Sequence, residues 1–192
     1  MKENGFNATF FIVANLNSDP NNLYRDTINK EQVKELSNSG FEIGSHTIGH
    51  PILIDLTEKE IEFELEESKR LLEETYSIKI NSVAFPYGKY DEDVLNIAQR
   101  YYMNARAIYN LNPKSFFIDS LGLQKDTNAQ SVCEYIHYAK EKKLWLVLVF
   151  HDIIDAPNLW DTSVTDFRKI LECAQNEKIK VDSINSCKNK YY

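Results

Sequence analysis

Residues 41–51 read FEIGSHTIGHP, and this segment governs the interpretation of the whole chain. Its first three residues have the apolar and β-branched character of a short strand. Gly44 and Gly49 permit backbone conformations that other residues avoid, and Pro51 ends regular structure. The segment is therefore predicted to be a strand that runs into a constrained turn.

His46 and His50 lie four residues apart in this turn, so their imidazoles can converge on one cation. Neutral imidazole is a ligand for zinc, cobalt, nickel and iron. Catalytic zinc sites use three protein ligands, so a third ligand, expected to be a carboxylate, has to come from elsewhere. Two histidines at this spacing are also common as ordinary polar loop residues, and the motif by itself leaves that alternative open.

Two further motifs follow strand-like segments. Residues 82–88 read SVAFPYG, a short strand that runs into a Pro-Tyr-Gly turn. Residues 144–152 read LWLVLVFHD, an apolar run followed by His151. Such a run is typical of a strand buried on both faces in a parallel sheet. His151 would then emerge at the carboxyl end of the strand, where barrels of alternating strands and helices place their active sites, although a histidine there can equally be a hydrogen-bonded structural residue.

Strands are predicted to alternate with helices, which implies parallel pairing through right-handed crossovers. The long helix that follows Thr57 begins with a capping box to Glu60. One face of this helix is expected to carry Ile61, Leu65, Ser68 and Leu72, and Glu66 is expected to pair with Arg70 at i and i+4. Its charged face is expected to be only solvated. The predicted strands are 9–14, 41–45, 82–85, 105–109, 117–122, 144–150 and 179–183. The other predicted helices are 30–39, 91–100, 129–143 and 163–176.

Together the motifs resemble those of the polysaccharide deacetylases of the NodB-homology type, carbohydrate esterase family four, over nearly the whole chain. The second family motif, H-[ST]-x-x-H-P, corresponds to residues 46–51. The third motif, R-x-P-[YF]-G, corresponds to 84–88, and the fifth to 149–151. Residues 4–13, NGFNATFFIV, are similar to the family's second strand. The resemblance implies an α/β fold, a distorted seven-stranded (β/α) barrel, in a single domain over 1–192.

The chain departs from the family pattern at two places. The first family motif, T-F-D-D-G, carries the aspartate that acts as general base and the one that completes the metal triad, and it is absent. The chain is therefore expected to be N-terminally incomplete, to lack the first strand, and to be nearly inactive by itself; a naturally shortened, inactive relative is the competing explanation. Ala84 stands where many relatives carry an arginine. A subgroup that acts on exopolysaccharide has a similar form without the arginine, F-A-Y-P-Y-G, so the alanine does not imply inactivity. Asp119 is the best candidate for the fourth motif.

The resemblance also implies a site. His46 and His50 would bind a divalent metal, zinc in most relatives and cobalt or nickel in some, which would polarise an acetamide carbonyl and acidify bound water. Tyr87 would contribute its backbone N–H to an oxyanion hole, and His151 would protonate the departing sugar amine. The residues expected to contact the substrate are Pro86, Tyr87 and Trp160.

Composition limits the possible partners. At 192 residues and 43% hydrophobic, the chain can bury a substantial core. A net charge of −7 argues against nucleic acid or an anionic membrane as the partner. No segment approaches the roughly 20 apolar residues that span a bilayer. Cys133, Cys173 and Cys187 form no C-x-x-C pair and indicate neither a zinc motif nor a disulfide framework; the first two are expected to be buried in helices and the third to be exposed.

We therefore expect a metal-dependent hydrolase that removes N-acetyl groups from a polysaccharide containing N-acetylglucosamine. By family resemblance it is expected to work outside the cytoplasm or at the cell envelope. Two alternatives stay open: a carbohydrate-binding pseudoenzyme that keeps the cleft, and a structural α/β domain whose histidines bind nothing. Peptidoglycan, chitin oligomers and exopolysaccharide are not distinguished, although Ala84 favours the last.

Overall fold

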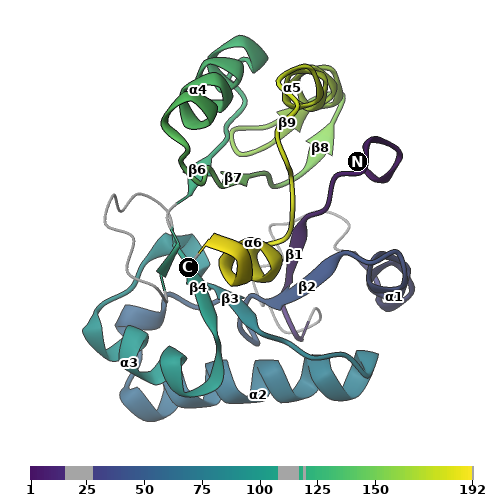
Figure 1. Ribbon diagram of the computed structural model, residues 1–192. Coiled ribbons are helices and arrows are strands. Elements are labelled where there is room, and N and C mark those ends of the chain that lie inside the picture. The colour runs from purple at the N-terminus through teal and green to yellow at the C-terminus, as the bar shows by residue number, and fades with distance from the viewer. Residues whose placement is uncertain (16–27, 108–116, 119, 192) are drawn as a thin grey trace. The chain divides into compact units, whose positions relative to one another are not determined.

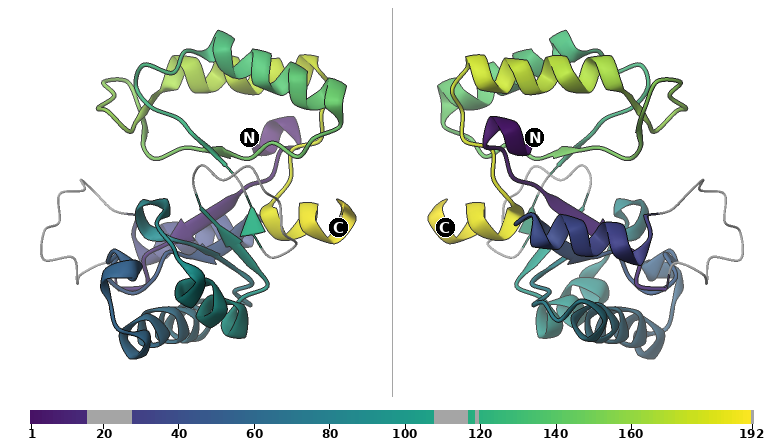
Figure 2. Two further views of the ribbon diagram at one scale, coloured as in Figure 1. Left: turned by 90° about the vertical axis from the view of Figure 1, so that its left-hand side faces the viewer. Right: turned by 90° about the vertical axis from the view of Figure 1, so that its right-hand side faces the viewer.

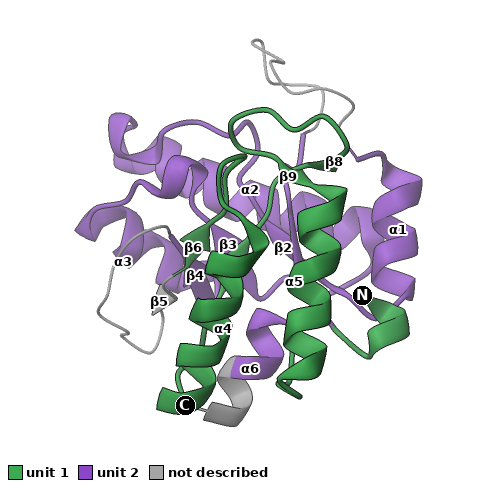
Figure 3. Ribbon diagram, turned by 90° about the horizontal axis from the view of Figure 1, so that it is seen from above, with its two compact units in different colours: residues 1–6, 108–111, 119–181 green, residues 7–107, 112–118, 182–192 purple. Residues whose placement is uncertain are grey.

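A computed structural model describes residues 1–15, 28–107, 117–118 and 120–191 (Figure 1). The chain divides into two compact units, each assembled from segments distant in sequence (Figure 3). Unit 1 comprises residues 1–6, 108–111 and 119–181, and unit 2 comprises residues 7–107, 112–118 and 182–192. The single domain predicted for 1–192 stays a prediction.

Unit 2 contains a parallel sheet of five strands in the order β1-β2-β3-β4-β5, so the predicted parallel pairing is confirmed. The strands are β1 Thr9–Ile12, β2 Glu42–Ser45, β3 Ser82–Ala84, β4 Asn104–Arg106 and β5 Phe117–Ile118. The helices of this unit are α1 Lys30–Asn38, α2 Glu58–Tyr76, α3 Glu92–Tyr101 and α6 Ile184–Tyr191, with short 3-10 turns at Leu53–Asp55 and Pro86–Gly88.

Local sequence sets where the helices begin. The Glu60 carboxylate accepts hydrogen bonds from the Thr57 backbone N–H at 2.8 Å and from the Thr57 hydroxyl at 2.7 Å, which confirms the predicted start of α2. Arg70 of α2 pairs with Glu67 and Glu74, so the ion pair expected with Glu66 is wrong. The side chains that cap the first turns of α1, α3, α4 and α5 belong to Asn29, Asp91, Asn128 and Ser163.

One face of the sheet forms the apolar core of unit 2. Ile43 and Val83 on the strands pack with Val33, Leu65 and Val94 from α1, α2 and α3. The residues of this group that are fully buried are Val33, Leu65, Val83 and Val94. Helices α2 and α3 lie on this side of the sheet, whereas α6 lies on the other (Figures 1 and 2).

The opposite face carries a row of hydrogen-bonded side chains, Thr9, Glu42, Ser82 and Asn104, which we call the polar row. Glu42 accepts hydrogen bonds from the hydroxyls of Thr9 at 2.7 Å and Ser82 at 2.6 Å, and Asn104 donates to Ser82 at 3.1 Å. The first two backbone N–H groups of α6 donate to Thr9 at 2.9 Å and to Glu42 at 3.0 Å. A carboxylate is favoured at this position because the amino end of a helix is electropositive.

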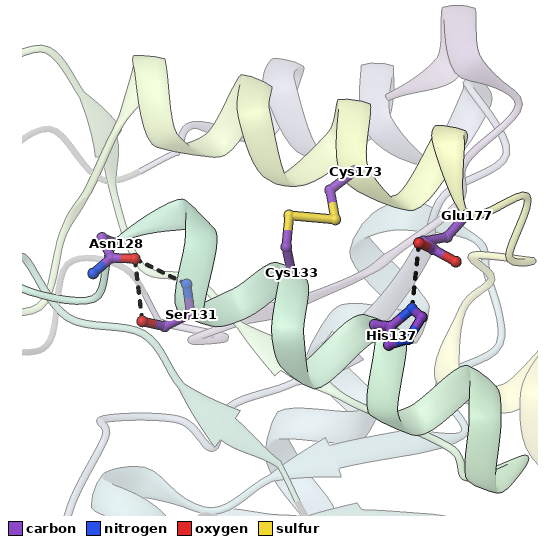
Figure 4. Close-up of a disulfide and its surroundings, with 6 residues drawn as sticks. All are labelled: Asn128, Ser131, Cys133, His137, Cys173 and Glu177. Carbon is purple, nitrogen blue, oxygen red and sulfur yellow. Dashed lines mark hydrogen bonds and ion pairs between the residues drawn. A yellow bond between two sulfur atoms is a disulfide. The ribbon is translucent and has the colours of Figure 1, made fainter.

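Unit 1 packs helices α4 (Ala129–Lys142) and α5 (Val164–Asn176) side by side over short parallel strand pairs (Figure 2). Cys133 of α4 and Cys173 of α5 form a disulfide with their Cα atoms 6.0 Å apart (Figure 4). The strands are β6 Leu121–Gly122, paired with β7 Leu148–Val149, and β8 Ile153–Ile154, paired with β9 Thr162–Ser163. A 3-10 turn spans Lys2–Asn4. No helix within the described ranges is long and apolar enough to cross a membrane.

Several predictions about the second half of the chain are wrong. The strand expected at 144–150 is reduced to Leu148–Val149, and none of its residues is fully buried, because β7 pairs only with β6 among the described strands. The strand expected at 179–183 is absent, and α6 follows directly. The cysteines also differ from expectation, since two form a disulfide and Cys187 is buried. The described strands lie in three sheets, so the barrel stays a prediction.

Candidate functional site

The turn after β2 is built on strained backbone. Thr47 and His50 have φ angles of 69° and 59°, in the left-handed region that β-branched and bulky residues rarely enter. The Thr47 side chain is fully buried, and its hydroxyl accepts a hydrogen bond from the His50 backbone N–H at 3.0 Å. Such strain costs about 1–3 kcal/mol per residue and is typical of functional sites. The unusual backbone conformations in this turn therefore fall on Thr47 and His50, and not on Gly44 or Gly49, which would permit them more easily.

Gly44 is required for space. A Cβ atom at this position would lie 2.6 Å from two ring carbons of Phe11 and 3.0 Å from the carbonyl oxygen of Ser82. The Phe11 ring therefore lies directly over Gly44, its register partner in β2.

Glu64 of α2 holds the turn. Its Oε2 accepts hydrogen bonds from the backbone N–H groups of Ile48 at 2.8 Å and Gly49 at 3.2 Å. Hydrogen bonds to an ionised acceptor are stronger than those between neutral groups. Glu64 is not recognisable from the sequence as part of the site, because nothing distinguishes it from its acidic neighbours on a helix face expected to be only solvated.

The two histidines are brought together. Their Nε2 atoms are 3.2 Å apart, and His46 Nδ1 lies 2.8 Å from the carbonyl oxygen of Ala84. Because a carbonyl can only accept, Nδ1 of His46 carries a proton, and in the neutral ring its Nε2 then presents a lone pair. Two nitrogens about 2.0–2.1 Å from one tetrahedral zinc would be roughly 3.3 Å apart, so the pair fits as two ligands. Within the described part of the chain, no third histidine, cysteine, aspartate or glutamate completes a metal-binding group.

The Pro86–Gly88 turn borders the histidines. Tyr87 has a φ of 56°, and its ring centroid is 4.8 Å from that of His50. The Tyr87 side chain is 54% exposed, whereas Pro86 is buried. The Gly88 N–H donates to the Phe85 carbonyl at 3.0 Å and closes the turn. The structure therefore gathers His46, His50, Pro86 and Tyr87 in unit 2, as the motifs predicted.

A hydrogen-bonded cluster supports β2 from the apolar side. The Ser45 hydroxyl donates to the Ser68 hydroxyl at 2.8 Å. The Tyr102 hydroxyl lies 3.0 Å from the Ser68 hydroxyl and donates to the Leu65 carbonyl at 2.7 Å. Burial raises the pKa of Tyr102 to about 12, because the phenolate would be poorly solvated there, while the hydrogen bonds with Ser45 and Ser68 act in the opposite direction. The cluster fixes the strand residue that precedes His46.

Arg106 is a charged residue that the motifs did not indicate. It lies at the end of β4 and is only 6% exposed, and among the described residues its Nε has no hydrogen-bond partner. Its guanidinium carbon is 5.3 Å from the centroid of the Phe11 ring. Burial lowers the pKa of Arg106 to about 10, because the cation loses its hydration.

His151 and Trp160 belong to unit 1. Their ring centroids are 6.2 Å apart and both side chains are exposed, Trp160 at 49%. The structure thus brings these two predicted site residues together on neighbouring loops of unit 1, whereas the four others form a group in unit 2. Asp119 lies outside the described residues.

Sequence comparison supports the assignment made from the motifs. The profile of the family described as polysaccharide deacetylase matches residues 1–105, more than half of the chain. YxkH of Bacillus subtilis, whose name assigns it to the polysaccharide deacetylases, is 30% identical over 100 residues, covering 52% of this chain and 34% of that protein. Chitin deacetylase 1 of Cryptococcus neoformans is 31% identical over 98 residues, covering 51% of this chain and 19% of that protein. The chain thus matches no more than about a third of the length of these relatives.

Solved structures extend the likeness to nearly the whole chain. A mutant of the peptidoglycan deacetylase PdaC from Bacillus subtilis has a TM-score of 0.62 at 16% identity, covering 98% of this chain and 79% of that one. A pseudoenzyme of carbohydrate esterase family four from Bacillus anthracis has a TM-score of 0.60 at 18% identity, covering 97% of this chain and 57% of that one. At these identities the similarity establishes the fold alone.

Proposed function

This chain belongs to the polysaccharide deacetylase family, and from that premise we propose that it serves metal-dependent removal of N-acetyl groups from a polysaccharide containing N-acetylglucosamine. The observation that carries the proposal is the 3.2 Å separation of the His46 and His50 Nε2 atoms. The proposal includes the distorted (β/α) barrel of the family as the architecture of the complete catalytic domain.

His46 and His50 would hold the metal, with zinc as the first choice and cobalt or nickel as substitutes. When bound, the metal would polarise the acetamide carbonyl and acidify a water molecule. The Ala84 carbonyl keeps the proton of His46 on Nδ1, which leaves Nε2 available to the metal. The Nε2 of His50 must then also be unprotonated, because a ligand nitrogen needs its lone pair.

The remaining roles concern the amide bond. Hydrolysis adds water to the carbonyl carbon, breaks the carbon–nitrogen bond and transfers a proton to the departing amine. The backbone N–H of Tyr87 would stabilise the oxyanion, and His151 would supply the proton. Pro86, the exposed Tyr87 ring and Trp160 would contact the sugar. Aromatic side chains suit this purpose because they combine a large apolar surface with a polar edge.

We further propose that this chain by itself has little or no deacetylase activity. It offers two protein ligands for the metal, and it lacks the first-motif aspartates that would supply the third ligand and the general base. The absence of a third ligand among the described residues also favours a second candidate function, a glycan-binding pseudoenzyme that keeps the cleft. The two candidates differ in one respect: catalysis requires the metal, whereas glycan binding by a pseudoenzyme does not.

We also propose that the protein works outside the cytoplasm. The Cys133–Cys173 disulfide supports this location, because disulfides form and persist in oxidising compartments and are rare in the reducing cytosol. The peptidoglycan deacetylase that shares this fold is named for a substrate of the cell envelope.

Calorimetric titration with Zn²⁺ tests the metal proposal. His46→Ala and His50→Ala are each expected to weaken binding at least tenfold. His137→Ala is the matched control, because His137 is an exposed histidine of α4 that forms ion pairs with Glu141 and Glu177 at 3.5 Å (Figure 4 shows the second contact). Equal loss in all three variants, or none in the first two, would reject the site.

A parallel assay separates the two candidate functions. Acetate release from N-acetylglucosamine oligomers is measured with zinc and with a chelator, alongside binding of the same oligomers. Trace release that requires zinc, His46 and His50 supports the deacetylase. Oligomer binding that is unchanged by the chelator, without any release, supports the pseudoenzyme.

A further inference from the structure

The Cys133–Cys173 disulfide borders a cavity of about 510 Å³. The cavity lies within unit 1 and is lined by residues from the amino-terminal parts of α4 and α5. Cys133 is one of these residues, together with Asn128 before α4 and with Asp166 and Lys169 of α5. The cavity therefore gives a small molecule a path to the Cys133 side of the cross-link.

The two cysteines have different surroundings. Cys133 lines the cavity, whereas Cys173 packs against the apolar core of unit 1, to which Ile136 and Ile170 belong. Both sulfurs are bonded in the same way, but thiols exchange with the sulfur that they can reach. Access from the cavity therefore favours reaction at Cys133.

The direction of approach gives the same preference. A thiolate attacks a disulfide sulfur from the side opposite to the sulfur that leaves. Figure 4 shows the Cys133 sulfur on the side of the S–S bond that faces Asn128, one of the lining residues. On the other side, Glu177 pairs with His137 at 3.5 Å and with Lys140 at 2.7 Å, so ion pairs join the helices at the Cys173 end. An in-line approach from the cavity ends at Cys133.

A lysine in the cavity favours an anionic reagent. Lys169 is exposed and lies four residues before Cys173, on the same face of α5. Asp166, the acid of the cavity, accepts a hydrogen bond from the Ser163 hydroxyl at 2.6 Å, and its carboxylate is thus engaged at the start of α5. Because opposite charges attract, Lys169 is expected to raise the local concentration of an anionic thiol.

We propose that the disulfide is a site of thiol exchange, at which a small anionic thiol forms a mixed disulfide with Cys133 and releases Cys173. The thiolate sulfur bonds to the Cys133 Sγ, the S–S bond breaks, and its electron pair leaves with Cys173, which takes a proton from water. A second thiol then displaces Cys133. The two reagent thiols are thereby oxidised to a disulfide, and both cysteines are reduced.

Exchange makes the tie between α4 and α5 reversible. A reducing thiol opens the link without unfolding the chain, and reoxidation closes it again. The inference involves neither a metal nor a polysaccharide, so it stands or falls independently of the proposed function.

Trapping the mixed disulfide tests the proposal. The native wild-type chain is treated with mercaptoethanesulfonate, quenched with N-ethylmaleimide at low conversion and mapped by peptide mass spectrometry. The thiol adduct is expected on Cys133 and the maleimide on Cys173, with roughly tenfold or greater preference over the reverse pattern. In concentrated urea both sulfurs are exposed, and comparable amounts of the two adducts are expected. This control separates selectivity due to the fold from selectivity due to local sequence, and it needs no variant.

Lys169→Gln tests the role of the charge. Exchange with mercaptoethanesulfonate is expected to slow about two- to fivefold, the range of an exposed ion pair, whereas exchange with mercaptoethanol, which lacks the sulfonate, is expected to keep its rate. Lys142→Gln is the matched control, because Lys142 is an exposed lysine of α4 that does not line the cavity, and it is expected to alter neither rate.

Three results would overturn the exchange site: an adduct mainly on Cys173, comparable adducts on both cysteines of the native chain, or no adduct until denaturant is added. The role of Lys169 would be overturned by equal slowing with both thiols in Lys169→Gln, or by no slowing at all.

Discussion

The Glu64 carboxylate accepts a hydrogen bond from the Ile48 backbone N–H at 2.8 Å, and this contact ties α2 to the turn that carries both histidines. The turn holds its residues in strained conformations, so an external support is required to maintain it. A residue that never touches the metal can thereby determine how well the two imidazoles converge.

Glu64→Ala is accordingly expected to weaken zinc binding roughly tenfold to a hundredfold, the range typical of residues that orient metal ligands. It is also expected to lower the free energy of unfolding by about 1–3 kcal/mol, because two backbone donors lose a charged acceptor. Zinc titration and urea denaturation measure the two effects. Glu134→Ala is the control, since Glu134 is exposed on α4. Unchanged zinc affinity in Glu64→Ala would show that the turn is held by other contacts.

Gly44→Ala is expected to reduce the free energy of unfolding by about 1–3 kcal/mol, because the added methyl overlaps the Phe11 ring and approaches the Ser82 carbonyl. Urea denaturation measures the loss. In a Phe11→Ala background the same substitution is expected to cost less, since the main obstacle is gone. Identical costs in both backgrounds would contradict the close packing of Phe11 on Gly44.

The disulfide is expected to stabilise unit 1. Its cysteines are 40 residues apart, and the chain-entropy relation gives about 4 kcal/mol for a loop of that length. A reducing agent is therefore expected to lower the Tm of the wild type and of Cys187→Ala, but not that of the double variant Cys133→Ser, Cys173→Ser. Thiol titration of the denatured, unreduced chain is expected to find only the Cys187 thiol. Detection of all three thiols would exclude the cross-link.

Alkaline pH is expected to destabilise the fold through Tyr102. Its pKa is 10.0 in the unfolded chain and about 12 when buried, so above pH 10 the tyrosine ionises more readily in the unfolded chain. Its contribution to the free energy of unfolding is therefore complete below pH 10 and is lost as the pH rises toward 12. Between pH 10 and pH 12 the free energy of unfolding of Tyr102→Phe is expected to fall by roughly 2–3 kcal/mol less than that of the wild type. The lowered pKa of Arg106 acts with the opposite sign, because its burial penalty is relieved above pH 10, but it is common to both proteins and cancels in the difference. Tyr135→Phe, at an exposed position, is the control; equal pH dependence in all three proteins would refute the role of Tyr102.

Sequence patterns predicted best the elements that carry local signals. The capping box at Thr57 and the spacing of Ile61, Leu65, Ser68 and Leu72 predicted both the start and the buried face of α2. The motifs at 46–51 and 84–88 likewise predicted that His46, His50 and Tyr87 would meet, because each follows a parallel strand and neighbouring strands bring their carboxyl ends to one edge.

Features that depend on contacts between distant segments could not be predicted in this way. The run at 144–150 is as apolar as a buried strand, but burial depends on how many neighbours a strand finds, and β7 pairs with β6 alone among the described strands. Arg106 is the last residue of a short strand, and its guanidinium contacts the ring of Phe11, almost a hundred positions earlier. Cys133 and Cys173 have no characteristic spacing, because their pairing follows from the packing of α4 on α5.

The hydrogen bond from the Ile184 N–H to the Thr9 hydroxyl joins residues 175 positions apart and has a consequence for synthesis. Strands β1 to β4 are complete once residue 106 has emerged from the ribosome, but the helix that covers the polar row follows about 80 residues later. At a typical rate of about 5–20 residues per second, the nascent sheet waits roughly 4–16 s with Glu42 and Thr9 facing solvent. Such long-range closure slows folding, so unit 2 is expected to reach its final state only after α6 has been synthesised.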